Sequence, residues 1–409
     1  MAEQNSRAAV VGAGIVGLSV AWFLQQEGFD VTVFDARGVA AGASAGNAGW
    51  ITPGMVSPLP EPGVVGYALR SLFRRDSPLR VTPTALPGTA RFLASFALNC
   101  TPAKWNSGVE QLAGICGLAM SSYDALARGG VMAELCSAPI VMAFADAAEA
   151  APVEHELQVT GAGMRELSAG ELREERPVLS ARARHGLRLD GQGYLQPLSY
   201  TKSLAESVQS RGGQIKSGVR VDRVEPASGG TISVTGAGER TAFDVVVLAN
   251  GAWLRRLGKY AGVRIPLAAG RGYSFTVKTA MPVSGPLYLP SLRVACTPAP
   301  GGMRLAGTME FRSADAPLDR RRIEAIVRSA KDYLDGVDWE SMSGLWVGPR
   351  PVTADGLPVI GATKLPGVYA AGGHGMWGMT LGPATGRLLA EYIAKGDRPA
   401  ELRHFDPCR

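Results

Sequence analysis

The sequence predicts an α/β fold that begins with a Rossmann-like dinucleotide-binding unit. An apolar run, Ala8 to Val11, leads into a G-x-G-x-x-G turn, and a helical pattern then continues to Gly28. A second apolar run, 31–34, ends on Asp35. The glycine motif alone is weak evidence, but strand, turn, helix, strand and acid in this order form one specific unit.

Each glycine of the turn has its own expected role. Gly12 permits the tight turn, Gly14 lets a pyrophosphate approach the backbone, and Gly17 lets the helix pack against the strand. The positive N-terminus of the helix is expected to face the phosphates. We expect Asp35 to accept hydrogen bonds from both ribose hydroxyls, which disfavours NADP and leaves NAD and FAD.

A second glycine loop near the C-terminus favours FAD. Residues 365–375 have the pattern of a strand that enters a glycine loop. Residues 382–386 are expected to open a helix that runs through Ile393, with Pro383 in its first turn. Backbone N–H donors and the helix dipole would stabilise a reduced, anionic isoalloxazine ring near N1 and O2, whereas a nicotinamide ring would not need them.

Composition indicates an ordinary folded protein that is long enough for two domains, with 409 residues, 46% hydrophobic and 19% charged. The five cysteines are odd in number and lack a C-x-x-C pair, so we expect neither a disulfide framework nor a metal site. The net charge of +6 is scattered in small arginine groups without a nucleic-acid-binding module. We therefore expect no nucleic-acid partner, and leave open a peripheral contact with an anionic membrane.

The N-terminus is polar and leads directly into the first strand, without the layout of a secretion signal. No apolar run approaches the roughly 18 residues of a membrane-spanning helix. The expected location is the cytoplasm, with a peripheral position at the inner membrane left open.

Changes of pattern divide the chain into two interleaved domains. Residues 1–57, 197–265 and 345–409 are expected to form the dinucleotide-binding domain, and 58–196 and 266–344 an α+β substrate domain. Helices are predicted over 91–98, 109–127, 168–175, 199–211 and 319–334, and strands over 139–145, 214–225, 245–249, 267–277 and 303–310.

With these motifs placed, the chain resembles the FAD-dependent D-amino-acid oxidase superfamily, and within it the bacterial D-amino-acid dehydrogenases and glycine oxidases. The resemblance covers essentially the whole chain through the N-terminal fingerprint and the motifs at 46–49, 52–54, 191–194, 247–253 and 348–361. It implies a Rossmann-like FAD-binding domain interleaved with an α+β substrate domain. The implied reaction is oxidation of the C–N bond of a small amino acid, with the D configuration favoured, to an imino acid by hydride transfer to flavin N5. The implied electron acceptor is a quinone or another carrier, or O₂.

The motifs and the resemblance together give the residues that are expected to bind FAD. They are Gly12, Gly14, Ile15, Val16, Gly17, Asp35, Ala36, Arg37, Ser44, Gly46, Asn47, Ala48, Gly49, Val221, Ala249, Asn250, Gly251, Trp253, Gly375, Met376, Trp377, Gly378, Met379 and Thr380. In relatives that bind FAD covalently, such as monomeric sarcosine oxidase, a cysteine lies beside the position of Arg350. Here the neighbours are glycine and proline, so noncovalent FAD is expected.

Three residues are candidates for the substrate site. Arg350 occupies the place where the superfamily keeps the arginine that binds the substrate carboxylate as a fork; without the resemblance, an interdomain ion pair is the alternative. The Tyr273 hydroxyl is expected either to touch the substrate or to face solvent from a sheet. His374 is expected near the flavin as a polar packing or hydrogen-bonding group, and no catalytic base is assigned.

The resemblance leaves the donor open, because Arg271 stands where an amino-acid dehydrogenase commonly has lysine. One alternative is an oxidase that passes electrons to O₂ from a secondary amine, such as sarcosine, a proline analogue or an opine, or from an alcohol carbon. The other alternative is a noncatalytic FAD-binding subunit.

Overall fold

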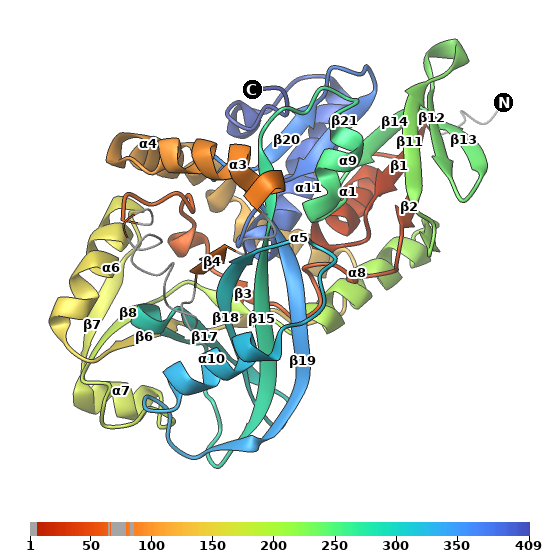
Figure 1. Ribbon diagram of the computed structural model, residues 1–409. Helices are drawn as coiled ribbons and strands as arrows, with labels where there is room; N and C mark the ends of the chain where they lie inside the picture. The colour runs from red at the N-terminus through yellow and green to blue at the C-terminus, as the bar shows by residue number, and fades with distance from the viewer. Residues whose placement is uncertain (1–5, 64–65, 67–78, 82–85) are drawn as a thin grey trace.

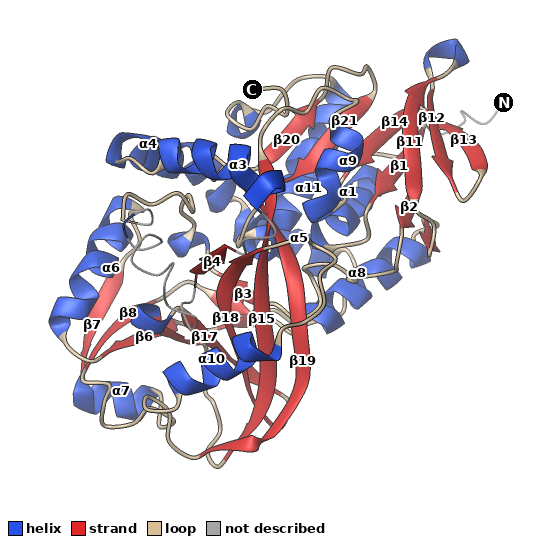
Figure 2. Cartoon of the chain, viewed as in Figure 1, coloured by secondary structure: helices blue, strands red, loops and turns tan. Residues whose placement is uncertain are grey.

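The computed structural model describes residues 6–63, 66, 79–81 and 86–409. Two sheets dominate it (Figures 1 and 2). In Figure 1 the long strands β15, β18 and β19 fill the centre, while segments from the two ends of the chain, red and blue, meet above them. The structure confirms the predicted α/β class.

The upper sheet is six-stranded in the order β10-β2-β1-β14-β21-β20. Its strands are parallel except for β20, which runs antiparallel to β21. The bounds are β1 (Arg7–Val11), β2 (Asp30–Asp35), β10 (Gln214–Ser217), β14 (Val245–Leu248), β20 (Val359–Ala362) and β21 (Val368–Gly372). Strands from the beginning, middle and end of the chain therefore build one sheet, as the Rossmann-like prediction requires.

Both faces of this sheet are covered, which explains its continuous apolar strands. Ala8 and Val10 pack in one core with helices α1 (Ile15–Gln26), α8 (Pro197–Ser210) and α11 (Gly378–Lys395). Ala9 and Val11 pack on the opposite side against β11 (Val221–Pro226), β12 (Ile232–Gly236), β13 (Glu239–Phe243) and α9 (Leu254–Gly258). Alternate side chains of one strand thus belong to two different cores.

The second sheet is nine-stranded, with the path β19-β15-β18-β17-β16-β6-β8-β7 and with β4 paired to β18. Its bounds are β4 (Leu79–Val81), β6 (Ile140–Phe144), β7 (Met164–Ser168), β8 (His185–Leu189), β15 (Leu267–Thr279), β16 (Leu287–Leu289), β17 (Val294–Ala299), β18 (Gly302–Phe311) and β19 (Val337–Thr353). Helix α10 (Arg320–Ala330) covers one face, where Tyr273 and Phe275 pack with Ile323 and Ile326. Ser274, which lies between Tyr273 and Phe275, points to the opposite face, where its hydroxyl donates to the carbonyl of Gly46.

The remaining elements surround these two sheets. Buried residues of α4 and α5 join the core that contains α1 and α11, and α6 packs beside β6 and β8. Their bounds are α3 (Leu86–Asn99), α4 (Pro102–Gly117), α5 (Ala119–Arg128), α6 (Ala147–Val159) and α7 (Ala169–Glu175), and a small third sheet contains β3 (Trp50–Ile51), β9 (Gly193–Tyr194) and β5 (Cys136–Ser137).

Several predicted elements differ from the structure at their ends. The single helix predicted over 109–127 is two helices, α4 and α5, which meet at Leu118. The helix predicted over 319–334 ends at Ala330, and Leu334 instead bridges Leu179. The strand region 214–225 contributes β10 and β11 to two different sheets. The division predicted between residues 344 and 345 lies inside β19.

The position predicted for Pro383 was wrong. Helix α11 begins at Gly378, four residues before the predicted start, so Pro383 lies inside the helix. Proline has no N–H and leaves the carbonyl four residues earlier, that of Met379, without its helical partner. The buried Tyr123 hydroxyl donates to this carbonyl at 2.6 Å and replaces the missing hydrogen bond. Helix α5, which is far from α11 in the sequence, therefore supplies the hydrogen bond that lets α11 begin at Gly378.

Within the described ranges, no helix combines the length and apolarity that a bilayer-spanning segment needs.

Candidate active site

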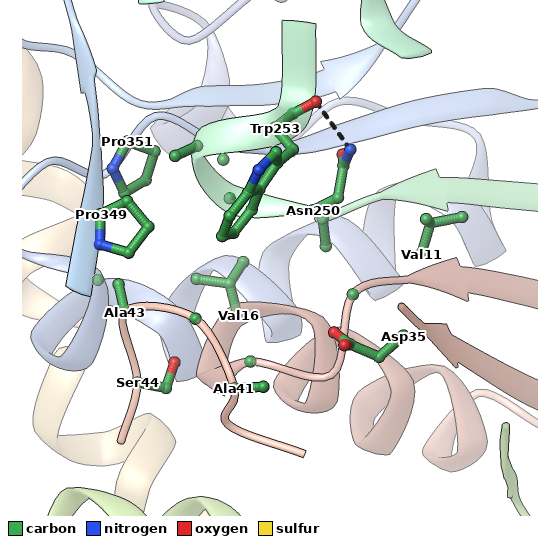
Figure 3. Close-up of a pocket in the computed structure, with 18 of the residues that line it drawn as sticks. Val11, Val16, Asp35, Ala41, Ala43, Ser44, Asn250, Trp253, Pro349 and Pro351 are labelled. Atoms are coloured by element: carbon green, nitrogen blue, oxygen red, sulfur yellow. Dashed lines mark hydrogen bonds between the residues drawn. The ribbon is translucent and has the colours of Figure 1, made fainter. Parts of the chain in front are cut away.

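A cavity with about 1440 Å³ of empty space, part of it open to solvent, lies where the two sheets meet. Its walls come from the β1–α1 turn, the loop after β2, β11, the end of β14, β19 and the loop before α11. Figure 3 shows Asp35 and Ser44 on one side of this cavity, with Trp253, Pro349 and Pro351 opposite. The lining therefore extends from the glycine turn after β1 to Arg350 on β19.

The glycine turn at one end of the cavity has no room for side chains. Gly12 has φ +120°, and a Cβ there would lie 2.4 Å from the carbonyl oxygen of Ala249. A Cβ on Gly17 would lie 1.9 Å from the carbonyl oxygen of Gly12, so only glycine lets α1 approach this turn. Ser44 Oγ accepts from the Ile15 N–H at 3.0 Å at the start of α1. These contacts leave a narrow backbone cradle at a helix N-terminus, which suits a pyrophosphate.

The Asp35 carboxylate is held in place by the backbone. Its Oδ2 accepts from the Ala13 N–H at 2.9 Å, and its Oδ1 accepts from the N–H groups of Arg37 and Gly38 at 2.8 and 2.9 Å. The side chain also lines the cavity. A carboxylate has about four acceptor sites, two on each oxygen. Oδ1 already accepts two hydrogen bonds, so the remaining site for a ribose hydroxyl is on Oδ2.

Three side chains of the nine-stranded sheet hold the loop at residues 46–48. The carbonyl of Gly46 accepts from Ser274 Oγ, that of Asn47 from Arg304 Nη1 at 3.4 Å, and that of Ala48 from Thr297 Oγ1 at 2.7 Å. In a trans peptide the N–H points away from the preceding carbonyl. The N–H groups of Asn47 and Ala48 therefore face away from the sheet.

Arg350 lies on β19 at the other end of the cavity. Its Nη1 donates to the carbonyl of Thr308 at 2.9 Å, and burial lowers its pKa to about 10, so it is charged at neutral pH. A Cβ on Gly272, on the adjacent strand β15, would lie 2.2 Å from the guanidinium carbon. Within the described chain Arg350 forms no ion pair, so the interdomain ion pair considered as an alternative is absent there. Its charge is available to an anionic ligand.

His374 lines the cavity but is 3% exposed. Its Nε2 lies 2.8 Å from Thr385 Oγ1, while Nδ1 has no hydrogen-bond partner among the residues that the structure describes. Burial lowers its pKa to about 4, so the imidazole is neutral at physiological pH. His374 therefore contributes no positive charge beside a flavin ring bound in this cavity.

Comparison with known proteins identifies the family of this chain. A family model described as FAD dependent oxidoreductase matches residues 7–392. The chain belongs to this family of FAD-dependent oxidoreductases. The side-chain-free cradle at Gly12 and Gly17 and the oriented Asp35 fit the pyrophosphate and ribose of the cofactor.

Individual relatives agree with this assignment. The oxidoreductase is 31% identical to a D-amino acid dehydrogenase from Cereibacter sphaeroides over 401 residues, which is 95% of this chain and 91% of that protein. Its fold is similar to that of glycine oxidase from Geobacillus kaustophilus, with TM-score 0.75, 22% identity and 99% of each chain covered. It is also similar to iminodiacetate oxidase from Chelativorans sp. BNC1, with TM-score 0.72, 20% identity and coverage of 98% and 99%.

Most residues expected to bind FAD lie in the cavity wall of the oxidoreductase. They are Gly12, Gly14, Ile15, Val16, Asp35, Ala36, Arg37, Ser44, Asn47, Val221, Ala249, Asn250, Gly251, Trp253, Gly375, Met376, Gly378 and Met379. The wall does not include Gly17, Gly46, Ala48, Gly49, Trp377 or Thr380. Several of these hold neighbouring backbone: Trp377 Nε1 donates to the carbonyl of Ser57 at 2.7 Å, and Thr380 Oγ1 accepts from the Thr52 N–H at 3.1 Å.

Tyr273 of the oxidoreductase lies away from this cavity wall. It is 0% exposed, and its hydroxyl donates to Glu310 Oε2 in a buried cluster with Arg271. Alternation along β15 places Tyr273 toward α10 and Ser274 toward the 46–48 loop. The hydroxyl thus faces neither the cavity nor solvent, the two positions considered from the sequence.

Other wall residues were missed by sequence reasoning. Asp315 follows β18, accepts from Trp253 Nε1 at 3.2 Å and pairs with Arg37 at 3.4 Å. Arg37 also stacks on the Trp253 ring at 4.4 Å. Arg220 and Arg256 line the end near β11. None of these positions lies in a recognisable motif, so tertiary contacts alone reveal them.

Proposed function

We propose that this FAD-dependent oxidoreductase oxidises the C–N bond of a small amino acid, with the D configuration favoured, to the imino acid. The observation that carries the proposal is Arg350, a cavity-facing guanidinium with no ion pair in the described chain. A planar guanidinium binds a carboxylate through two charge-assisted hydrogen bonds. The similarity to a D-amino acid dehydrogenase supports both the donor class and its configuration.

When bound, FAD supplies the two-electron oxidant by accepting a hydride at N5. The chain itself positions the donor. Arg350 holds the α-carboxylate, and the carbonyl of Thr308 fixes one arm of the guanidinium. The N–H groups of Asn47 and Ala48 point away from the sheet, and in this scheme they would donate to the flavin edge. Holding the donor in one orientation removes much of the entropic cost of bringing its reacting carbon to the flavin.

Proton transfer needs little from the protein. The substrate amine enters in its neutral form, and its N–H proton leaves to water as the imine forms. His374, neutral and enclosed, is a polar packing group in this scheme. Hydrolysis of the imino acid to the keto acid and ammonia takes place in solution. As electron acceptor we propose a quinone or another carrier in preference to O₂, which agrees with similarity to a dehydrogenase.

Anaerobic stopped-flow reduction of the flavin by paired D- and L-amino acids tests the proposal. We expect D-amino acids to bleach the wild type. Arg350→Lys, which keeps the charge but loses the fork, should slow reduction, and Arg350→Ala should cost on the order of 3–5 kcal/mol in kcat/KM. Both variants should keep their flavin. Arg223→Gln, at a side chain 72% exposed, is the matched control for removal of an arginine charge.

Near-equal reduction of the wild type and the Arg350 variants by a carboxylate donor would exclude the proposed role. Reduction by an alcohol or an uncharged amine that is indifferent to both substitutions would instead support the rival donors. Oxygen consumption with the same donors separates an oxidase from a dehydrogenase.

A further inference from the structure

A second guanidinium lies on the sheet face that carries Arg350. Met303 and Leu305 of β18 pack in the core beneath α10, so Arg304 between them projects from the opposite face. This is the face from which Ser274 reaches Gly46. Arg304 Nη1 lies 3.4 Å from the carbonyl oxygen of Asn47, and Asn47 lines the cavity. Arg304 itself is not part of the cavity wall, but it lies directly behind Asn47, which is, and on the same sheet face as Arg350.

Within the part of the chain that the structure describes, Arg304 has no carboxylate partner. Burial lowers its pKa, and Asn47 provides its hydrogen bond to the protein. One carbonyl at 3.4 Å compensates poorly for moving a cation out of water. The neighbouring loop carbonyls are held by the hydroxyls of Ser274 and Thr297, so holding the loop does not require a charge.

The spacing of the two arginines suits a short ligand. Arg304 and Thr308 lie four residues apart on β18, which corresponds to about 13 Å of extended strand. The carbonyl of Thr308 accepts from Arg350. Two arginine side chains and a short dicarboxylate between them can bridge such a span. An α-carboxylate on Arg350 would neutralise the charge of Arg350 and leave that of Arg304 without a counter-ion.

We propose that Arg304 binds a second acidic group of the substrate, so that the preferred donors are dicarboxylic amino acids such as D-aspartate and D-glutamate. This inference rests on the proposed function, in which Arg350 takes the α-carboxylate. It goes further by assigning the substrate side chain a negative charge and a length of a few bonds.

The test compares acids with their amides, which have nearly the same shape. Flavin reduction by D-glutamate and D-glutamine, and by D-aspartate and D-asparagine, is measured anaerobically in the wild type, Arg304→Gln, Arg304→Lys and Arg223→Gln. The wild type and Arg223→Gln should prefer the acids by roughly 10- to 100-fold in kcat/KM. Arg304→Gln should lose this preference through slower reaction with the acids, and Arg304→Lys should retain part of it.

A binding measurement separates the subsite from catalysis. Glutarate and butyrate differ by one carboxylate, and each is titrated into the flavin-loaded protein while the flavin absorbance is followed. Glutarate should bind the wild type more tightly, and Arg304→Gln should remove that advantage. Thermal unfolding of each variant checks that the fold is intact.

Equal losses for acids and amides in Arg304→Gln would overturn the inference, because they would show that Arg304 serves the 46–48 loop or the flavin. A wild type without preference for acids would overturn it as well. If no amino acid reduces the flavin while glutarate binding still depends on Arg304, the subsite is supported and the proposed reaction fails.

Discussion

Asp35 shows how a single side chain can be positioned before any ligand is bound. Three backbone N–H groups, those of Ala13, Arg37 and Gly38, donate to its carboxylate across the turn that follows β2. His374 differs from Asp35, because it is buried and its Nδ1 has no hydrogen-bond partner in the described part of the chain. The contacts of Asp35 and the burial of His374 each predict the effect of a single substitution.

Asp35→Ala should weaken FAD binding by roughly 1.5–3 kcal/mol, because the ribose hydroxyls lose a charged acceptor. Titration of apoprotein with FAD, followed by quenching of flavin fluorescence, measures this change. Asp30→Ala, at an exposed position of the same strand, is the control. An unchanged dissociation constant in Asp35→Ala would show that the ribose binds elsewhere.

His374 should make the protein less stable in mild acid. Burial lowers its pKa from 6.5 to about 4, so between these values the unfolded chain binds a proton that the folded chain does not. Stability is therefore lost as pH falls from 6.5 toward 4, by about 3 kcal/mol from this residue. Urea unfolding across this range should show a shallower pH dependence for His374→Asn than for the wild type. Identical slopes would contradict this assignment.

Helix α11 depends on a contact that its own residues do not provide. Pro383 cannot donate to the carbonyl of Met379, and Tyr123 of α5 supplies the hydrogen bond at 2.6 Å. This allows the helix to begin at Gly378, beside the cavity, where Gly378 and Met379 form part of the wall. The position of the second glycine loop thus depends on how α5 packs against α11.

Tyr123→Phe should destabilise the protein by about 1–3 kcal/mol, since it leaves a buried carbonyl without a partner. Denaturant unfolding with FAD bound provides the measurement. Tyr260→Phe removes a hydroxyl from a residue that is 72% exposed and should have almost no effect. Equal stabilities for the two variants would mean that the Met379 carbonyl is satisfied in another way.

At the scale of the whole molecule, the cavity lies where the two large sheets meet, and its walls come from separate parts of the chain. One wall comes from the β1–α1 turn and β14, and the other includes β19 and Asp315. Among the described residues that form this wall there is no cysteine, and the neighbours of Arg350 are Pro349 and Pro351. Burial also raises the pKa of Cys116 and of Cys296 to about 12, which keeps these thiols protonated.

Acid precipitation of the purified protein should release all of its flavin as free FAD, because the cofactor is held by hydrogen bonds and charge. The absorbance of the supernatant and of the redissolved pellet measures the distribution. Flavin that stays with the pellet after washing would reveal a covalent link and would contradict this expectation.

Local sequence determined the first βαβ unit almost completely. The positive φ of Gly12, the start of α1 at Ile15 and the end of β2 at Asp35 follow from residues that are neighbours in the chain. Such features depend on backbone dihedrals and short turns, which nearby residues control. Most of the residues expected around FAD from this unit, among them Gly12, Gly14 and Asp35, accordingly lie in the cavity wall.

Tertiary structure decided the other side of the cavity. The sequence could not show that Tyr273 faces α10 while Ser274 faces the 46–48 loop, because a shift of one residue in a strand reverses which side chains face the core. It also could not place Asp315 beside Trp253, or Arg304 beside Asn47. These contacts join residues that are far apart in the chain, and only the pairing and packing of the sheets bring them together.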